Sequence, residues 1–325
     1  HVESGTSFNT ATGWMEVQKR IRKSNNWERM IKILSYAAAV LVPVFFVGIS
    51  LKYTTHDYFS NKSVLIAQPI LPGAAKAILT LDNGETINLN KETADALQTI
   101  EGTNIQIDST TLNYQLAQST SVSPKPVYNK VEIPRGGEYA LVLSDGTKVH
   151  LNSMSSLRFP VAFTTGKREV ELQGEAYFEV SKTGQPFIVN ANGIQVEVLG
   201  TTFNISAYPD EEYQTTLVNG SVKVSAEKGE SLILKPSQQA TIALGSNSIQ
   251  VRTVDTSFYT SWVKGKINFK DQRLEDIMKT LSRWYDMNVV YENEKLKNIR
   301  FGCNLNRYEE ITSFSLILVF FLVHS

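Results

Sequence analysis

The chain has 325 residues, 42% of them hydrophobic and 20% charged, so it has enough apolar material for folded domains, about two by length. Its 32 Lys and Arg residues balance its 32 Asp and Glu residues, which argues against direct nucleic-acid binding. A single cysteine excludes an internal disulfide, and with only four histidines a Cys/His metal site is not expected; we predict no metal and no cofactor.

The first predicted element is a transmembrane helix at residues 33–51, a run of nineteen residues without a charge. A helix of that length reaches about 28 Å, close to the thickness of the apolar core of a bilayer. The alternatives are a buried core helix and a cleaved signal peptide. The lack of a polar face disfavours the first, and the long preceding segment disfavours the second.

Basic residues on the two sides of this span predict its orientation. The residues that precede it include Lys19, Arg20, Arg22, Lys23, Arg29 and Lys32, whereas Lys52 and Lys62 follow it closely. Because the more basic flank stays inside, residues 1–32 are expected to form a cytoplasmic tail and the rest of the chain to lie outside. The chain starts with His1 rather than Met, so we expect this tail to be a truncated region.

Outside the span we expect a juxtamembrane β region and linker at residues 52–130 and a β-rich domain at residues 131–254. Residues 168–180 alternate between apolar and polar side chains. The apolar positions are Val170, Leu172, Ala176, Phe178 and Val180, and the polar ones are Glu169, Glu171, Gln173, Glu175 and Glu179. A period of two predicts a half-buried strand, or a hairpin bent at Gly174.

Two Asn-Gly pairs, Asn192-Gly193 and Asn219-Gly220, separate β-rich runs and predict tight hairpins. Further strands are expected at residues 232–234 and 239–244. Residues 78–90 resemble residues 140–152 at a spacing of 62, each reading as strand, Gly-containing turn and strand. The expected architecture is therefore mainly β, built of stacked hairpins in a solenoid-like arrangement.

Residues 255–325 are predicted to form a small C-terminal α/β domain. Apolar residues recur at helical spacing between Arg273 and Tyr285, and Asp271 is the expected N-cap. Strands are predicted at residues 287–291 and 299–303. After residue 310 the sequence becomes a short apolar run, an atypical end that is too short to span a bilayer.

The polar residues do not suggest an active site for an external substrate. Glycoside hydrolases use a pair of carboxylates, and the glutamates of residues 169–179 could supply one. The same glutamates are, however, what the solvent-exposed face of a strand requires. Ser144, Asp145 and His150 are the residue types of a hydrolase triad, but an Asp-Gly turn explains Asp145, and the sequence has no G-x-S-x-G motif. We therefore expect no enzymatic activity apart from self-cleavage, considered below.

Aromatic residues gather in the C-terminal domain, among them Trp262, Phe269, Trp284, Tyr285 and Tyr291. Most are expected in its core. Trp and Tyr are also common anchors of protein interfaces, so a docking surface is the second interpretation.

Several motifs together resemble a known family, the FecR family of transmembrane anti-sigma regulators in its Bacteroidetes form. They are residues 133–160, 168–180 (REVELQGEAYFEV), 186–208 (PFIVNANGIQVEVLGTTFNISAY) and 215–225 (TTLVNGSVKVS). Residues 262–291 are similar to the companion C-terminal domain, which is itself similar to the short N-terminal domain of secretins and TonB-dependent receptors.

The resemblance implies a single-pass inner-membrane protein whose cytoplasmic segment holds an extracytoplasmic-function sigma factor. Its periplasmic part would receive a signal from the N-terminal signalling domain of a TonB-dependent outer-membrane receptor for iron chelates or glycans. Periplasmic and intramembrane proteases are further implied partners. The implied partner-binding residues are Trp14, Trp262, Phe269, Leu274, Trp284 and Tyr285.

Some members of the family cut themselves at a Gly–Thr bond, which corresponds here to Gly200–Thr201 in VLGTTFNI. The Thr hydroxyl would attack the preceding carbonyl to form an ester. An ordinary turn at the end of a strand is the alternative interpretation.

A different class of function remains open, a membrane-anchored periplasmic protein that binds or degrades glycans. It predicts a ligand groove with exposed aromatic residues on the β domain, whereas the aromatic residues lie mostly in the C-terminal domain.

Overall fold

The computed structural model describes residue 15 and residues 72–89, 96–100, 103–108, 110–114, 126–163, 166–227, 229–291 and 293–309. The chain divides into two compact units, residues 1–69 and 70–325. Trp14 and the predicted span at residues 33–51 lie outside the described residues. Among the described residues, no helix combines the length and the apolar character that crossing a membrane requires.

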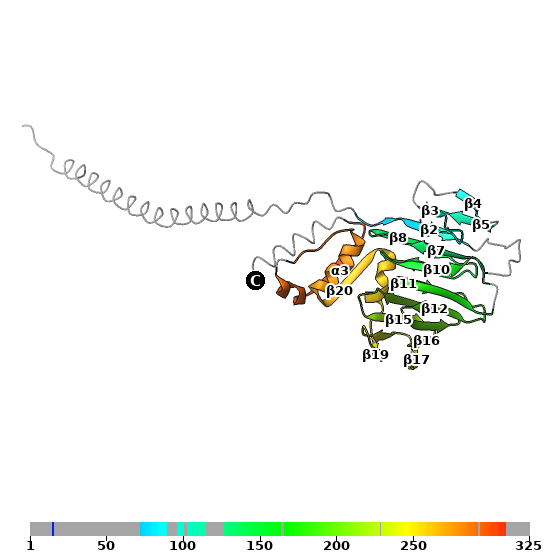
Figure 1. Ribbon diagram of the computed structural model, residues 1–325. Helices are drawn as coiled ribbons and strands as arrows, with labels where there is room; N and C mark the ends of the chain where they lie inside the picture. Colours follow the sequence, from blue (N-terminus) through cyan, green and yellow to red (C-terminus); the bar gives the residue numbers. More distant parts are fainter. Residues whose placement is uncertain are drawn as a thin grey trace, which may run out of the picture. The chain divides into compact units, whose positions relative to one another are not determined.

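The second unit is mainly β, as predicted, and its β domain consists of two sheets that share one long strand, β11 (Figure 1). Sheet I has the order β3 (Thr86–Leu89), β2 (Ala77–Thr80), β7 (Tyr128–Glu132), β10 (Ser156–Pro160), β11 (Arg168–Glu179), β12 (Phe187–Ala191), β13 (Ile194–Val198), β16 (Val222–Ser225) and β17 (Ser231–Leu234). Sheet II has the order β4 (Ala96–Ile100), β5 (Thr103–Ile107), β6 (Thr111–Asn113), β8 (Gly137–Val142), β9 (Lys148–Leu151), β11, β14 (Thr202–Ala207), β15 (Tyr213–Asn219), β18 (Gln238–Ile242) and β19 (Gln250–Thr253). The short strand β1 (Ala74–Ala75) runs parallel to β8.

Strand β11 changes sheets at Gly174. Its first half pairs with β10 and β12 in sheet I, and its second half pairs with β9 and β14 in sheet II. Gly174 has φ +89°, and a Cβ there would lie 2.7 Å from the Cα of Ser155. Glycine is therefore required twice, for its backbone conformation and for the close approach of another chain segment. The predicted strand is confirmed as one continuous element with a bend.

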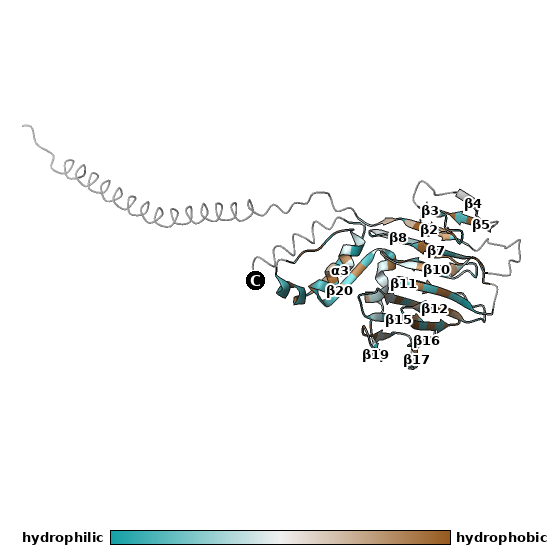
Figure 2. Cartoon of the chain, viewed as in Figure 1, coloured by the Kyte–Doolittle hydropathy of each residue, from teal (hydrophilic) through white to brown (hydrophobic). Residues whose placement is uncertain are grey.

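The core lies between the two sheets and takes side chains from both. All five apolar residues predicted on one side of β11 are buried, and the alternation of polar and apolar residues is visible along the strands in Figure 2. Phe178 of sheet II lies 6.1 Å from Phe187 of sheet I, and Tyr114 lies 5.1 Å from Phe159 across the same space, measured between ring centroids. Aromatic contacts of this kind join the inner faces.

The 62-residue repeat corresponds to two hairpins of the same construction, β2–β3 in sheet I and β8–β9 in sheet II. In the first turn the amide of Gly84 donates to the carbonyl of Leu81, and in the second the amide of Gly146 donates to the carbonyl of Leu143, each over 2.9 Å. These leucines are both buried. From β12 onward, the paired strands β12–β13, β14–β15, β16–β17 and β18–β19 fall alternately in sheet I and sheet II.

One of the two predicted Asn-Gly hairpins is confirmed and the other is wrong. Asn192 and Gly193 both have positive φ and join the paired strands β12 and β13. Asn219-Gly220 instead leads from β15 in sheet II to β16 in sheet I, which pair with different neighbours. Asn219 has no positive φ, whereas Gly220 has φ +99°, and a Cβ there would also lie 2.8 Å from the hydroxyl oxygen of Thr201.

The C-terminal domain contains α2 (Ser257–Thr260), the 3-10 helix η1 (Ser261–Lys264), β20 (Lys266–Arg273), α3 (Leu274–Trp284), the 3-10 helix η2 (Glu294–Asn298) and β21 (Arg300–Asn306). The predicted helix is confirmed as α3, and the last predicted strand as β21, which pairs antiparallel with β20. Residues 287–291 form no strand, which corrects that prediction. They follow a turn at Asp286, with φ +49°, and Val290 is 87% exposed.

The predicted N-cap is also wrong. Asp271 lies in the bulge of β20 with φ +50°, and its carboxylate accepts a hydrogen bond from Nε of Arg300. Helix α3 starts directly from the strand at Leu274, whose amide donates to the carbonyl of Ile299 over 2.7 Å. The neighbouring chain segment, not a capping side chain, satisfies this first amide.

We expect Gly174→Ala to destabilise the protein more than Gly84→Ala. The two glycines have nearly the same φ, +89° and +88°, but a Cβ at residue 84 meets no atom within 4 Å. Conformational strain at either position costs about 1–2 kcal/mol, and the clash with Ser155 adds a further ~1–3 kcal/mol at Gly174. Chemical denaturation measures both variants. Equal losses would show that β11 can bend without this glycine.

Candidate functional site

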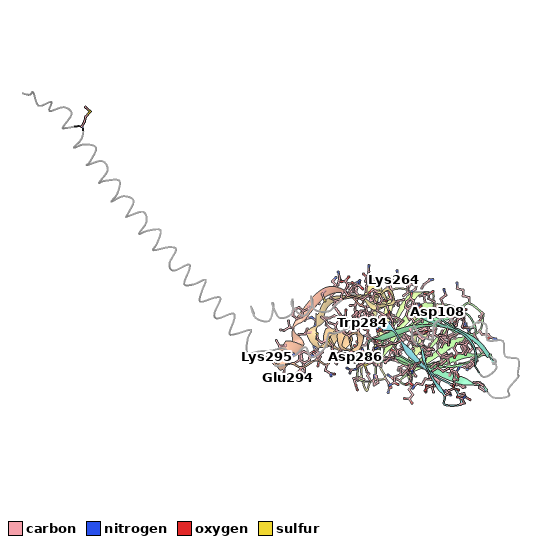
Figure 3. All side chains as sticks on the ribbon, turned by 90° about the horizontal axis from the view of Figure 1, so that it is seen from above. Asp108, Lys264, Trp284, Asp286, Glu294 and Lys295 are labelled. Carbon is pink, nitrogen blue, oxygen red and sulfur yellow. The ribbon has the colours of Figure 1, made fainter. Side chains whose placement is uncertain are left out.

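The candidate site is the junction where the C-terminal domain covers the outer face of sheet II. The small core of the C-terminal domain contains Trp262, Phe269 and Trp284, and Tyr177 of β11 packs against it. Figure 3 shows Trp284 where α3 meets the β domain. The junction thus joins the two predicted domains within the second unit.

Glu175 of β11 is the centre of a hydrogen-bond network at this junction. Asn152 donates to one of its carboxylate oxygens over 2.7 Å, and Asn204 of β14 donates to the other over 3.0 Å. The side-chain oxygen of each asparagine accepts from an indole N–H of the C-terminal domain. Trp284 donates to Asn152 and Trp262 donates to Asn204, both over 3.0 Å.

The directions of these hydrogen bonds follow from the tryptophans. An indole N–H can only donate, so each asparagine must turn its oxygen toward the tryptophan and its NH₂ toward Glu175. The group between the two NH₂ groups must then accept on both sides. An ionised carboxylate meets that requirement, whereas a protonated one offers a hydrogen on one oxygen. We call Glu175, Asn152, Asn204, Trp262 and Trp284 the carboxylate bridge.

Arg307 joins the two domains beside the bridge. Its guanidinium donates to the side-chain oxygen of Asn152 over 2.9 Å and to the hydroxyl of Ser153 over 2.7 Å, and it pairs with Glu138 at 3.0 Å. It also donates to the carbonyl of Gly137 and lies 4.6 Å from the ring centroid of Trp284. The residue is fully buried, so these partners replace water around its charge.

The first strand of the unit meets the junction at the same place. Ala74 donates to the carbonyl of Gly136, and Lys76 donates to the carbonyl of Glu138, on either side of the carbonyl that Arg307 uses. A Cβ at Gly73 would lie 2.5 Å from Nε of Arg307, so this segment passes directly over the arginine.

A second charged contact lies on helix α3. Arg283 pairs with Glu211 at 2.5 Å, and its guanidinium lies 3.9 Å from the ring centroid of Tyr208. The carbonyl of Arg283 accepts from the amide of Gly136 over 2.7 Å. Arg283 thus binds the β domain through both its side chain and its backbone carbonyl.

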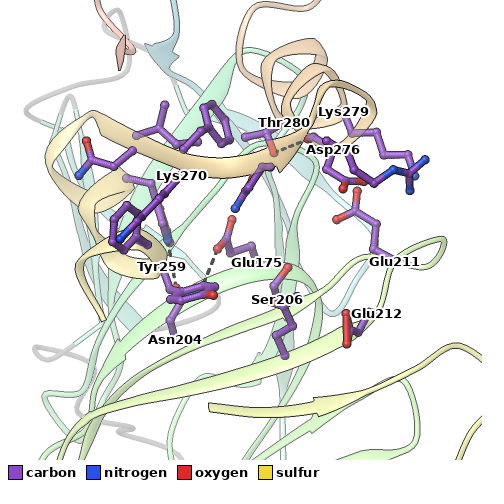
Figure 4. A pocket seen from close by; sticks show the side chains of 18 of the residues that line it. Glu175, Asn204, Ser206, Glu211, Glu212, Tyr259, Lys270, Asp276, Lys279 and Thr280 are labelled. Atoms are coloured by element: carbon purple, nitrogen blue, oxygen red, sulfur yellow. Dashed lines mark hydrogen bonds between the residues drawn. The ribbon is translucent and has the colours of Figure 1, made fainter. Parts of the chain in front are cut away.

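Between the sheet and the C-terminal domain lies a cavity of about 540 Å³. Glu175, Asn204 and Ser206 line it from the sheet, and Lys270 and Thr280 from the C-terminal domain (Figure 4). The described residues contain no cluster of three or more His, Cys, Asp or Glu arranged for a metal ion.

Burial raises the pKa of Glu175 from its ordinary value, against the hydrogen bonds of Asn204 and Asn152 and the charge of Arg283, which lower it. The cavity leaves part of the side chain accessible, but the surrounding protein has replaced most of its hydration. The two amide donors require the ionised carboxylate, and its burial means that keeping it ionised costs solvation free energy.

The described structure places five of the predicted partner-binding residues inside the protein. The exposed fractions are 5% for Trp262, 6% for Phe269, 4% for Leu274, 1% for Trp284 and 4% for Tyr285. The two tryptophans donate hydrogen bonds to asparagines of the β domain. Phe269 and Tyr285 pack in the core of the C-terminal domain, and Leu274 is buried at the start of α3. Whether any of them binds a partner remains a prediction.

Sequence reasoning missed the asparagines and Arg307, and it read Glu175 as one of several solvated glutamates. The other glutamates of β11 do face outward, for example Glu171, which pairs with Arg158. Alternation predicts the side of the sheet but not that another domain covers part of it. A faint signal was present, since Asn152 ends the second copy of the repeat.

The triad residue types are not assembled. Asp145 is buried against Arg168, with 2.6 Å between the charged groups, and it also accepts from the amide of Thr147 in its own turn. The hydroxyl of Ser144 accepts from the amide of Phe163. His150 pairs within sheet II, where burial lowers its pKa.

Gly200 and Thr201 lie in the turn between β13 and β14. Thr201 is buried, and its hydroxyl donates to the carbonyl of Ser221 over 2.9 Å. Gly200 does not have positive φ, and a side chain there would have to displace the side chain of Lys182.

We predict that acidification stabilises the wild-type protein relative to a Glu175→Gln variant. Because the pKa of Glu175 is raised on folding, the folded state binds a proton more tightly than the unfolded state. The difference in free energy of unfolding should therefore rise as the pH falls from neutral toward the ordinary carboxyl range, and level off below it. Denaturation at several pH values measures this difference. If the difference in free energy falls on acidification instead, the hydrogen bonds from the asparagine side chains lower the pKa of Glu175 by more than burial raises it.

The self-cleavage prediction is tested by blotting the full chain for two fragments that join at Gly200–Thr201. Thr201→Ala removes the nucleophile and should leave one intact band, whereas Thr201→Ser keeps a hydroxyl and should still be cut. An intact wild-type band in native cells would overturn the prediction.

Comparison with known families agrees with this two-domain arrangement. Residues 129–223 match the FecR protein family, and residues 266–314 match the FecR C-terminal family. The two matches fall on the β domain and on the domain that covers it, in the order expected from the sequence motifs.

Two crystal structures of a candidate anti-sigma factor from Parabacteroides distasonis ATCC 8503, at 1.65 and 2.50 Å resolution, are similar to the chain. Each is 28% identical and covers 58% of this chain, with 89% and 90% of the other chain covered and TM-scores of 0.54 and 0.51. Comparison with curated proteins gives no match. The chain therefore contains both FecR family domains, in the order that the sequence motifs predicted.

Proposed function

We propose that the protein is an anti-sigma factor that relays a signal across the inner membrane. Residues 33–51 would form the single span, and the tail before them would hold an extracytoplasmic-function sigma factor in the cytoplasm. The FecR domain and its C-terminal companion would lie in the periplasm, where the N-terminal signalling domain of a TonB-dependent receptor binds. Periplasmic and intramembrane proteases would act on this chain during signalling.

The observation that carries the proposal is the joining of the two family domains by the carboxylate bridge. A protein that relays a signal needs contacts between the domain that receives it and the segment that leads toward the membrane. Arg307 of the C-terminal domain donates to the carbonyl of Gly137, and the segment of β1 donates to the carbonyls on either side of it. The similar structures, named as a candidate anti-sigma factor, support the same function.

The glycan-binding alternative has less support. It requires exposed aromatic residues on the β domain, and within the described part of that domain no Tyr, Phe or Trp side chain is among the exposed large hydrophobic residues. The exposed aromatic residue of the described chain, Tyr308, belongs to the C-terminal domain and donates to Glu138.

Crosslinking of the full-length protein in native cells, followed by mass spectrometry of its partners, tests the proposal. We expect a sigma factor and an outer-membrane receptor. Trp14→Ala should lose the sigma factor and keep the receptor, whereas Trp27→Ala, a matched change in the same tail, should keep both. Recovery of glycans or envelope components without either protein would favour the alternative.

A further inference from the structure

The junction between the domains depends on polar contacts. Two indole N–H groups, two amides and one carboxylate form the bridge, and Arg307 and Arg283 add ion pairs. Charged groups pay a desolvation cost when they are buried, so contacts of this kind hold less tightly than an apolar junction of the same size. Separation of the domains would return these groups to water.

The same contacts hide two interface-type side chains. Trp262 and Trp284 are 5% and 1% exposed, and both indole N–H groups are used inside the chain. Tryptophan is among the residues that contribute most to binding at protein interfaces. In the closed arrangement neither ring is available to another protein.

We propose that the carboxylate bridge is an autoinhibitory latch, which keeps Trp262 and Trp284 from the receptor's signalling domain until the C-terminal domain separates from the FecR domain. This inference rests on the proposed function and adds the regulation of the same site. Closed and open forms are then two states of one chain, and the receptor binds the open one. The apparent association constant for the receptor is then the intrinsic constant of the open form multiplied by the fraction of molecules that are open.

Asn204 gives the sharpest test of the latch itself. Asn204→Ala leaves the indole of Trp262 and one oxygen of Glu175 without partners, so the open state becomes more populated. Hydrogen exchange of the full-length chain should then show protection of residues 257–309 reduced about tenfold or more. Asn190→Ala is the matched control. Asn190 of β12 also donates to a glutamate of β11, but this glutamate, Glu169, is exposed and lies away from the junction.

A reversible crosslink tests whether opening is required. An ideal Cβ on Gly136 lies 3.8 Å from Cβ of Asp286, the usual separation in a disulfide. A Gly136→Cys and Asp286→Cys double variant, with Cys303→Ser to remove the native thiol, should therefore lock the domains together. Both positions have positive φ, so the two single-cysteine variants control for strain.

In the locked protein we expect the sigma factor to be captured as in wild type and the receptor to be lost, with capture restored by a reducing agent. Asn204→Ala should capture more receptor than wild type. Equal exchange in the Asn204→Ala and Asn190→Ala variants would overturn the latch. Equal capture of the receptor by locked and reduced protein would overturn its autoinhibitory role. A wild-type protein that captures neither partner would overturn the proposed function, while the exchange comparison still decides whether the bridge holds the domains together.

Discussion

The indole N–H groups can only donate hydrogen bonds, and this restriction determines the hydrogen-bond directions throughout the junction. Because Trp262 and Trp284 can only donate, the orientations of Asn152 and Asn204 are fixed, and the group between them must accept twice. Glu175 meets this demand only as an anion, in a place where burial disfavours the anion. The junction is therefore specific in geometry and moderate in strength, a combination suited to a contact that has to open.

The β domain supplies a stable frame for that contact. Its two sheets share β11, which bends at Gly174, and Glu175 is the next residue along the strand. Because the bend sets the direction of the second half of β11, it also sets where the carboxylate lies under the C-terminal domain. The buried pair of Arg168 and Asp145 holds the start of the same strand. The start and the middle of the strand are thus held by contacts within the β domain.

Periodicity predicted the elements well because it reports local burial. It gave β11, helix α3 and the repeated hairpins. It failed where the outcome depends on contacts distant in sequence. Asn219-Gly220 has the composition of a hairpin, but its strands pair in different sheets, and Gly220 combines a positive φ with a close approach to Thr201. Glu175 carries no local mark that another domain covers it. The family resemblance located both domains but not the bridge between them.

The three consecutive residues 136–138 have a mechanical consequence. Strand β1 and Arg307 bind the backbone carbonyls of this one stretch, β1 at its two ends and Arg307 in the middle. A force that pulls the C-terminal domain away through Arg307 is therefore borne by the same peptide groups that hold β1, a strand of only two residues. Load would peel β1 from β8 before it disturbs the long strands of the sandwich. Strand β1 is thereby the element of the β domain on which such a load would act first.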